Sequence, residues 1–132
     1  MVFVGIKGKK ERTVSEADTA KTVGSGALRV LATPAMLAMM EAAACESVAP
    51  FLNAGETTVG TMLNVQHLSA TPVGMKVSAV SEVTETEGKR IVFRVSAYDE
   101  CGLIGEGIHE RVMVAEDRFT QKAYGKLEDS AR

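Results

Sequence analysis

The sequence is poor in cysteine and has no long apolar run, and each absence argues against a class of protein. Its two cysteines, Cys45 and Cys101, are too few for a disulfide framework and show no metal-ligand spacing. The amino-terminal run MVFVGIKGKK soon reaches charged residues, unlike a signal peptide or a membrane span. We therefore expect a cytoplasmic protein that does not contact membranes.

A strong charge of either sign is also missing. The 15 Lys and Arg residues stand against 17 Asp and Glu residues, for a net charge of −2. This balance offers no electrostatic attraction to nucleic acid or to an anionic membrane. With 132 residues, 45% of them apolar, the chain has the length and composition of one globular domain over residues 1–132. The polar segment at 118–132 is expected to fray.

The sequence does contain an apolar stretch with an acid in its middle, TPAMLAMMEAAACESVAPFL. Pro34 suits the first turn of a helix, Thr33 suits the cap before it, and Pro50 ends the helical pattern. At about 3.6 residues per turn, Glu41 falls on an apolar stripe, whereas Glu46 lies about 140° away and can face solvent. An unpaired carboxylate on an apolar face is costly, so Glu41 requires either a partner or a function.

After this helix the apolar residues alternate, which is typical of half-buried strands. The short connections between these strands favour antiparallel neighbours. Two further strands are expected before the helix, joined by a segment, DTAKTVGSGA, with the composition of a flexible linker. In chain order, the predicted strands cover residues 5–14, 28–32, 57–68, 76–85, 91–97 and 103–114.

One apolar helix followed by antiparallel strands predicts an α+β fold in which a curved sheet wraps the helix. The helix covers only one face of such a sheet. A second copy of the chain is the simplest cover for the other face, so we expect a dimer.

His67 is a further candidate for a functional residue. It falls in phase with Val59 and Leu63, on the strand face expected to meet the helix. Thr33, Glu41 and His67 would then bring a hydroxyl, a carboxylate and an imidazole to one pocket, which are the ingredients of acyl-transfer chemistry. Each also has a structural interpretation, as a plain N-cap, a buried acid held by backbone donors and a core histidine.

Three segments, TPAMLAMME, GTMLNVQHLSATPVG and GEGIHERVMV, resemble the hot-dog-fold thioesterases, most closely the fluoroacetyl-CoA thioesterase group. The similarity runs without gaps from Thr33 to Arg111. It implies the hot-dog fold, in which a curved antiparallel sheet wraps a long central helix. It also implies an acyl-CoA thioesterase that is a homodimer or a dimer of dimers. Coenzyme A enters only as part of the substrate, and no metal or other cofactor is expected.

The resemblance also assigns residues. The family's catalytic threonine, glutamate and histidine fall on Thr33, Glu41 and His67, with both spacings kept. A glycine beside the thioester falls on Gly60, and an arginine near the coenzyme A end falls on Arg111. These two are the expected substrate-binding residues. The alternatives are a strand bulge at Gly60 and a solvated strand charge at Arg111.

The chemical roles stay open at the level of sequence. His67 is a general base or proton shuttle, whereas Glu41 orients the imidazole, activates water or attacks the carbonyl. Thr33 positions water or the carbonyl, and Gly60 supplies close backbone approach. His109 and its neighbour Glu110 are expected to be structural or dimer-contact residues.

Two other functions compete with hydrolysis. A non-catalytic module that binds acyl-CoA or another small ligand would keep the same fold. A lyase acting on an enoyl thioester is disfavoured, because an aspartate–histidine hydratase motif is not evident.

The chain departs from the family in the segment before Thr33, where relatives carry an aromatic lid over a small acyl pocket. No Phe, Tyr or Trp occurs between Phe3 and Phe51, and the matching region is AKTVGSGALRVLA. A lid of small residues predicts a more open and mobile pocket. We therefore expect hydrolysis of several short to medium acyl-CoAs, without strong selection of the fluorinated acetyl group.

Overall fold

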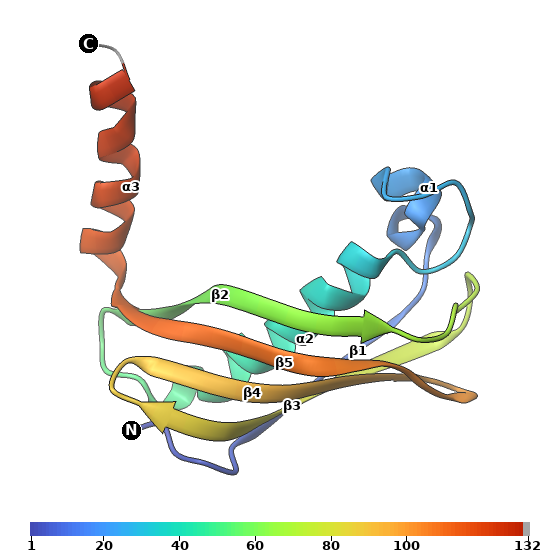
Figure 1. Ribbon diagram of the computed structural model, residues 1–132, viewed down its shortest axis with the longest axis horizontal. Coiled ribbons are helices and arrows are strands. Elements are labelled where there is room, and N and C mark those ends of the chain that lie inside the picture. Colours follow the sequence, from blue (N-terminus) through green and yellow to red (C-terminus); the bar gives the residue numbers. More distant parts are fainter. Residues whose placement is uncertain (131–132) are drawn as a thin grey trace.

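The computed structural model describes residues 1–130 and contains one five-stranded antiparallel sheet with the order β1-β3-β4-β5-β2 (Figure 1). The first and second strands of the sequence therefore form the two edges. The strands are β1 (Lys7–Thr13), β2 (Glu56–His67), β3 (Lys76–Glu87), β4 (Arg90–Asp99) and β5 (Gly102–Ala115). The helices are η1 (Glu16–Asp18), α1 (Ala20–Val23), α2 (Thr33–Val48), η2 (Ala49–Phe51) and α3 (Glu116–Ser130).

The long helix α2 lies across one face of the curved sheet, as the α+β prediction requires (Figure 1). Its methionines Met36, Met39 and Met40 are buried and pack with Phe93 of β4 in the core. Gly8 marks the closest approach of β1 to α2, since a Cβ there would collide with the carbonyl oxygen of Ala43. None of the described helices is long and apolar enough to cross a membrane.

Two features at the start of α2 differ from the sequence prediction. The helix begins at Thr33 with Ala32 as the N-cap, so the Thr33 hydroxyl is not used for capping. The expected flexible linker before it forms η1 and α1. Hydrogen bonds from the backbone N–H of Ala20 to Val30 (2.9 Å) and from that of Lys21 to Leu28 (3.1 Å) brace this segment. The strand expected at 28–32 is reduced to isolated bridges.

The carboxy-terminal segment also differs from its prediction. The residues expected to fray from Arg118 onward are helical through Ser130, in the helix α3 that stands away from the sheet (Figure 1). One side of α3 leaves Phe119, Tyr124 and Leu127 exposed. Among residues 1–130, no contact buries these three side chains.

A β-bulge in β2 overturns the predicted phase of that strand. The register with β5 shifts between Gly60 and Met62. Before the shift, the Thr58 hydroxyl faces Cys45 of α2, so the next residue, Val59, points to the opposite side of the sheet. After the shift, the residues in phase with His67 face α2. Val59 and His67 therefore lie on opposite faces, because the extra residue reverses the alternation.

Candidate active site

Thr33 and His67, 34 positions apart in the sequence, are joined by a hydrogen bond of 2.7 Å between Thr33 Oγ1 and His67 Nδ1. Thr33 is the first residue of α2 and His67 the last residue of β2, so the fold brings the two ends together. Both line a cleft of about 290 Å³, together with Ser25 and Leu68. The cleft therefore lies between the braced α1 segment and the end of β2.

The surroundings of His67 favour a neutral imidazole. Burial disfavours the charged ring and lowers the pKa of His67, against a smaller opposing effect of the backbone at Ser69. Its Nε2 is buried and has no hydrogen-bond partner within residues 1–130. Nδ1 is held by Thr33. The ring thus presents one engaged and one free nitrogen, which suits proton transfer.

Glu41 lies two helical turns beyond Thr33, about 12 Å along α2. Its carboxylate is not sealed in the core, since the side chain is 42% exposed, and Oε2 lies 3.7 Å from Arg111 Nη1. A Cβ at Gly60 would stand 2.6 Å from the same oxygen, so Gly60 leaves space beside the carboxylate. The partner that the sequence required for Glu41 is therefore an arginine.

Arg111 is buried, which excludes the alternative of a solvated strand charge. Its Nε donates to Thr58 Oγ1 (2.8 Å) and its Nη2 to the Thr58 carbonyl (2.9 Å). The guanidinium thus faces the inside of the sheet beside Glu41. The contact to coenzyme A implied by the resemblance stays a prediction.

His109 is the residue whose place near the site the sequence analysis missed. It is fully buried, with Nδ1 2.8 Å from the Met62 carbonyl and Nε2 3.2 Å from Arg111 Nη1. Burial lowers the pKa of His109, and the nearby Arg111 charge acts in the same direction. His109 is two residues from Arg111, so both side chains lie on one face of the strand. This spacing could have predicted that His109 lies beside Arg111.

Within one chain these residues form two pairs and not one pocket. Thr33 contacts His67, while Glu41 contacts Arg111 near Gly60. Gly60 and His67 are separated by most of β2, roughly 20 Å along a strand. The predicted convergence of all three catalytic candidates is therefore absent from the single chain.

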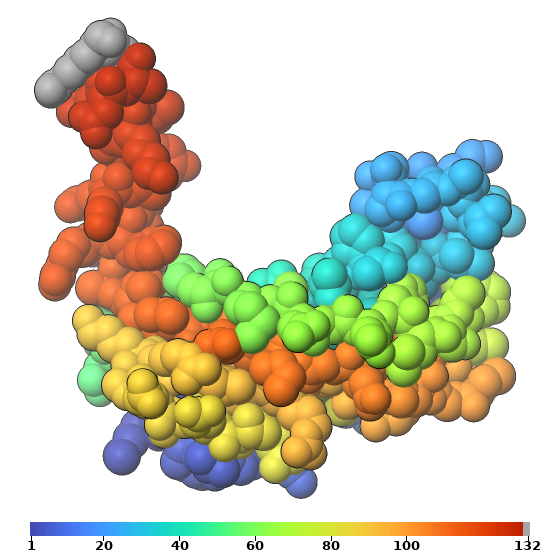
Figure 2. All heavy atoms as spheres, in the orientation of Figure 1, coloured from blue at the N-terminus to red at the C-terminus, as the bar shows by residue number. Residues whose placement is uncertain are grey.

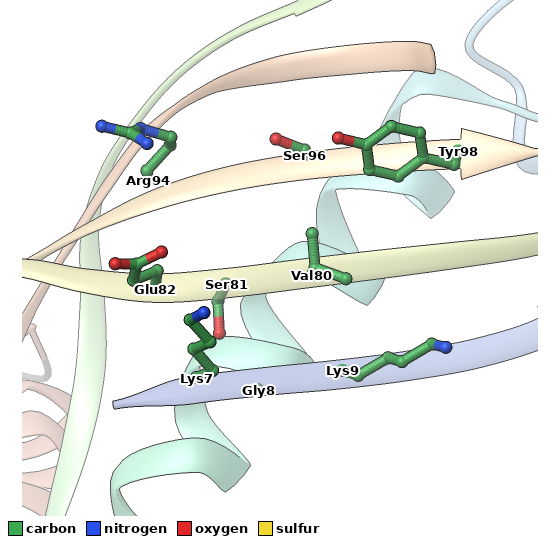
Figure 3. Close-up of a pocket in the computed structure, with 9 residues that line it drawn as sticks. All are labelled: Lys7, Gly8, Lys9, Val80, Ser81, Glu82, Arg94, Ser96 and Tyr98. Atoms are coloured by element: carbon green, nitrogen blue, oxygen red, sulfur yellow. The ribbon is translucent and has the colours of Figure 1, made fainter. Parts of the chain in front are cut away.

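A larger groove than this cleft lies elsewhere, along β1, β3 and β4 (Figure 3). It measures about 530 Å³ and contains none of the candidate site residues. Lys7, Glu82 and Arg94 line it and are neighbours across the three strands, so their charges alternate. In the part of the chain that the structure describes, no three His, Cys, Asp or Glu side chains are grouped to hold a metal ion.

Known proteins match this chain over most of its length. The sequence profile of the fluoroacetyl-CoA-specific thioesterases matches residues 14–117. The chain is 40% identical over 97 residues to the fluoroacetyl-CoA thioesterase of Streptantibioticus cattleyicolor, covering 74% of this chain and 70% of that protein.

The chain belongs to the fluoroacetyl-CoA-specific thioesterase family. As a member, it is an acyl-CoA thioester hydrolase.

Solved structures confirm the hot-dog fold. A fluoroacetyl-CoA thioesterase superposes with a TM-score of 0.89 at 32% identity, covering 96% of this chain and 98% of that one. A thioesterase superfamily member from Thermus thermophilus gives 0.88 at 31% identity, covering 98% and 96%. A hot-dog-like protein from Thermanaerovibrio acidaminovorans gives 0.84 at 28% identity, covering 93% and 91%.

Proposed function

We propose that Thr33, Glu41 and His67 carry the hydrolysis of short or medium acyl-CoA thioesters by this chain. The hydrogen bond of 2.7 Å between Thr33 and His67 is the observation that carries the proposal. Water adds to the thioester carbonyl, its proton passes to a base, and the C–S bond then breaks to release the coenzyme A thiolate. The neutral imidazole of His67 suits the base. The acid and the free thiol are the products, and no cofactor is needed.

Glu41 has a distinct role in this proposal. Its carboxylate faces the space left by Gly60, the residue that the family resemblance assigns to the thioester. We assign the glutamate to orienting or activating the water that attacks there. Arg111 lies 3.7 Å from Glu41 Oε2 and thereby limits the positions that the carboxylate can take.

A second copy of the chain would join the two pairs. The edge strand β2 has no charged residue from 57 to 66, unlike the other edge, β1, which is rich in lysine. Figure 2 shows α3 and the α1 segment rising on either side of an uncovered β2 edge. Antiparallel pairing of two β2 strands about Asn64 would bring Gly60 near His67 of the partner subunit. We therefore propose a homodimer, alone or as a dimer of dimers.

The acyl group is expected to be short or medium in length. The segment that covers the Thr33–His67 cleft contributes small residues, with Ser25 among the cleft lining and no aromatic side chain. The backbone hydrogen bonds from Ala20 and Lys21 hold this cover in place, so its openness derives from side-chain size. A cytoplasmic location remains a prediction.

Release of free thiol from a panel of acyl-CoAs tests the proposal. Acetyl-, butyryl- and hexanoyl-CoA should each be hydrolysed, and His67→Ala should abolish the release without unfolding the protein. A non-catalytic module would bind the same thioesters without releasing thiol. That outcome would refute the proposed function.

A further inference from the structure

We propose that His109 is a positioning residue of this site, which holds the Arg111 guanidinium against Glu41 through its unprotonated Nε2. The inference rests on the proposed function of Glu41. His109 touches none of the reacting atoms and acts through its neighbour Arg111.

Two partners determine the tautomer of the His109 ring. The Met62 carbonyl, 2.8 Å from Nδ1, only accepts hydrogen bonds, so Nδ1 carries the proton. Arg111 only donates, so Nε2, 3.2 Å from its Nη1, is the acceptor. Each contact independently requires the same neutral form. The lowered pKa of His109 agrees with it.

This neutral ring completes the attachment of Arg111. Thr58 accepts hydrogen bonds from Nε and Nη2, and His109 accepts one from Nη1. Acceptors therefore hold three nitrogens of a planar group, and the group has little rotational freedom. The Nη1 that His109 holds is the atom that faces Glu41 Oε2 at 3.7 Å. His109 thus determines where the positive charge meets the carboxylate.

A neutral acceptor suits this position better than a charged one. A carboxylate in place of the imidazole would compete with Glu41 for the guanidinium, and a protonated imidazole would repel it. The ring itself is fixed from behind by Phe93, with ring centroids 5.9 Å apart and 28° between the planes. It also borders the space beside Gly60, where a Cβ would lie 3.2 Å from His109 Cε1.

Two amide substitutions separate the two hydrogen bonds of the ring. His109→Gln places its amide near the Nε2 position and can accept from Arg111, but it loses the bond to Met62. His109→Asn places its amide near Nδ1 and can donate to Met62, but it leaves Arg111 without its acceptor. We expect His109→Asn to lower kcat about tenfold or more with little change in KM, because displaced charge near the reacting atoms costs rate. His109→Gln should restore most of that loss.

The outcome is checked against Arg111 directly. In an Arg111→Met background, His109→Asn should cost no further rate if it acts through the guanidinium. A slower His109→Gln than His109→Asn, or equal rates for the two variants, would overturn the proposal. Either result would mean that the rate depends on the hydrogen bond to Met62 or on the size of the ring, and not on the contact with Arg111.

A readout that needs no turnover separates this inference from the proposed function. Nitrogen NMR of the wild-type protein should show His109 protonated at Nδ1 and bare at Nε2, and slow exchange of the Arg111 Nε–H with water. Exchange should accelerate in His109→Asn and remain slow in His109→Gln. The other tautomer in the wild-type protein would overturn the positioning role, whether or not the protein hydrolyses thioesters. A wild-type protein with this tautomer but no thiol release would refute only the proposed function.

Discussion

Thr33 Oγ1 and His67 Nδ1 lie 2.7 Å apart and link the first residue of α2 to the last residue of β2. The Thr33 hydroxyl does not cap α2, whose N-cap is Ala32, and His67 Nε2 is buried without a hydrogen-bond partner among the described residues. An imidazole held at one nitrogen and free at the other is arranged for proton transfer.

If Thr33 and His67 act as a unit, their substitutions should not be additive. His67→Ala should lower kcat/KM by at least about a hundredfold, as expected for loss of a general base. Adding Thr33→Val to that variant should then cost little more. Thr33→Ser, which keeps the hydroxyl, is the matched control. Independent, additive losses measured on folded variants would contradict the shared role.

Replacing Glu41 by glutamine should separate function from stability. The side chain is 42% exposed, so Glu41→Gln should leave the melting temperature almost unchanged while thioester hydrolysis falls by at least about a hundredfold. Glu46→Gln is the control, because Glu46 lies on the same helix in an exposed ion pair with Lys10. A folded Glu41→Gln variant with full turnover would remove the catalytic assignment.

If two chains associate through β2, a variant that cannot dimerise should be inactive. Asn64→Lys would place two lysines close together at the centre of the pairing and should give a chain of 14.0 kDa by light scattering, half the mass of the wild-type dimer. The monomeric variant should not hydrolyse thioesters, since Glu41 and His67 are apart within one chain. Thr84→Lys, on the interior strand β3, should remain dimeric. A wild-type protein that is monomeric at micromolar concentration would refute this association.

Stability should fall as the pH is lowered through about 6.5. The pKa values of both histidines, His67 and His109, lie below the ordinary value of 6.5 in the folded state because of burial. Between the folded pKa and 6.5 the unfolded chain binds more protons, so the free energy of unfolding rises with pH in that window. Denaturant titrations at several pH values give the free energy of unfolding. In a His67→Gln/His109→Gln variant, this free energy should depend less steeply on pH in that window. Identical slopes for the two proteins would contradict the burial of the two rings.

Substrate range should be broad. One methylene is worth only about 1–3 kcal/mol in a pocket without a shaped rejecting contact, and the cover over the Thr33–His67 cleft lacks aromatic side chains. We expect kcat/KM values for fluoroacetyl- and acetyl-CoA within about tenfold of each other, with turnover of butyryl- and hexanoyl-CoA. A preference of several orders of magnitude for the fluorinated substrate would show that Thr33, Glu41 and His67 discriminate without the lid.

The local elements of this protein follow from its sequence alone. Pro34 and Pro50 bracket α2 because a ring without an N–H is tolerated at a helix start and disfavoured within a helix. Alternating apolar residues after the helix predicted the strands β2 to β5, since a half-buried sheet requires that period. Both signals act between residues close in sequence, which is why they can be recognised without the fold.

Tertiary structure alone decided how these elements meet. The bulge between Gly60 and Met62 exists only through pairing with β5, so no periodicity could have placed Val59 on the outer face. The burial of Arg111 and His109 depends on α2 crossing the inside of the sheet, which turns two strand residues into neighbours of Glu41. Long-range contacts select the surroundings of each side chain, and those surroundings determine charge, hydrogen bonding and chemical role.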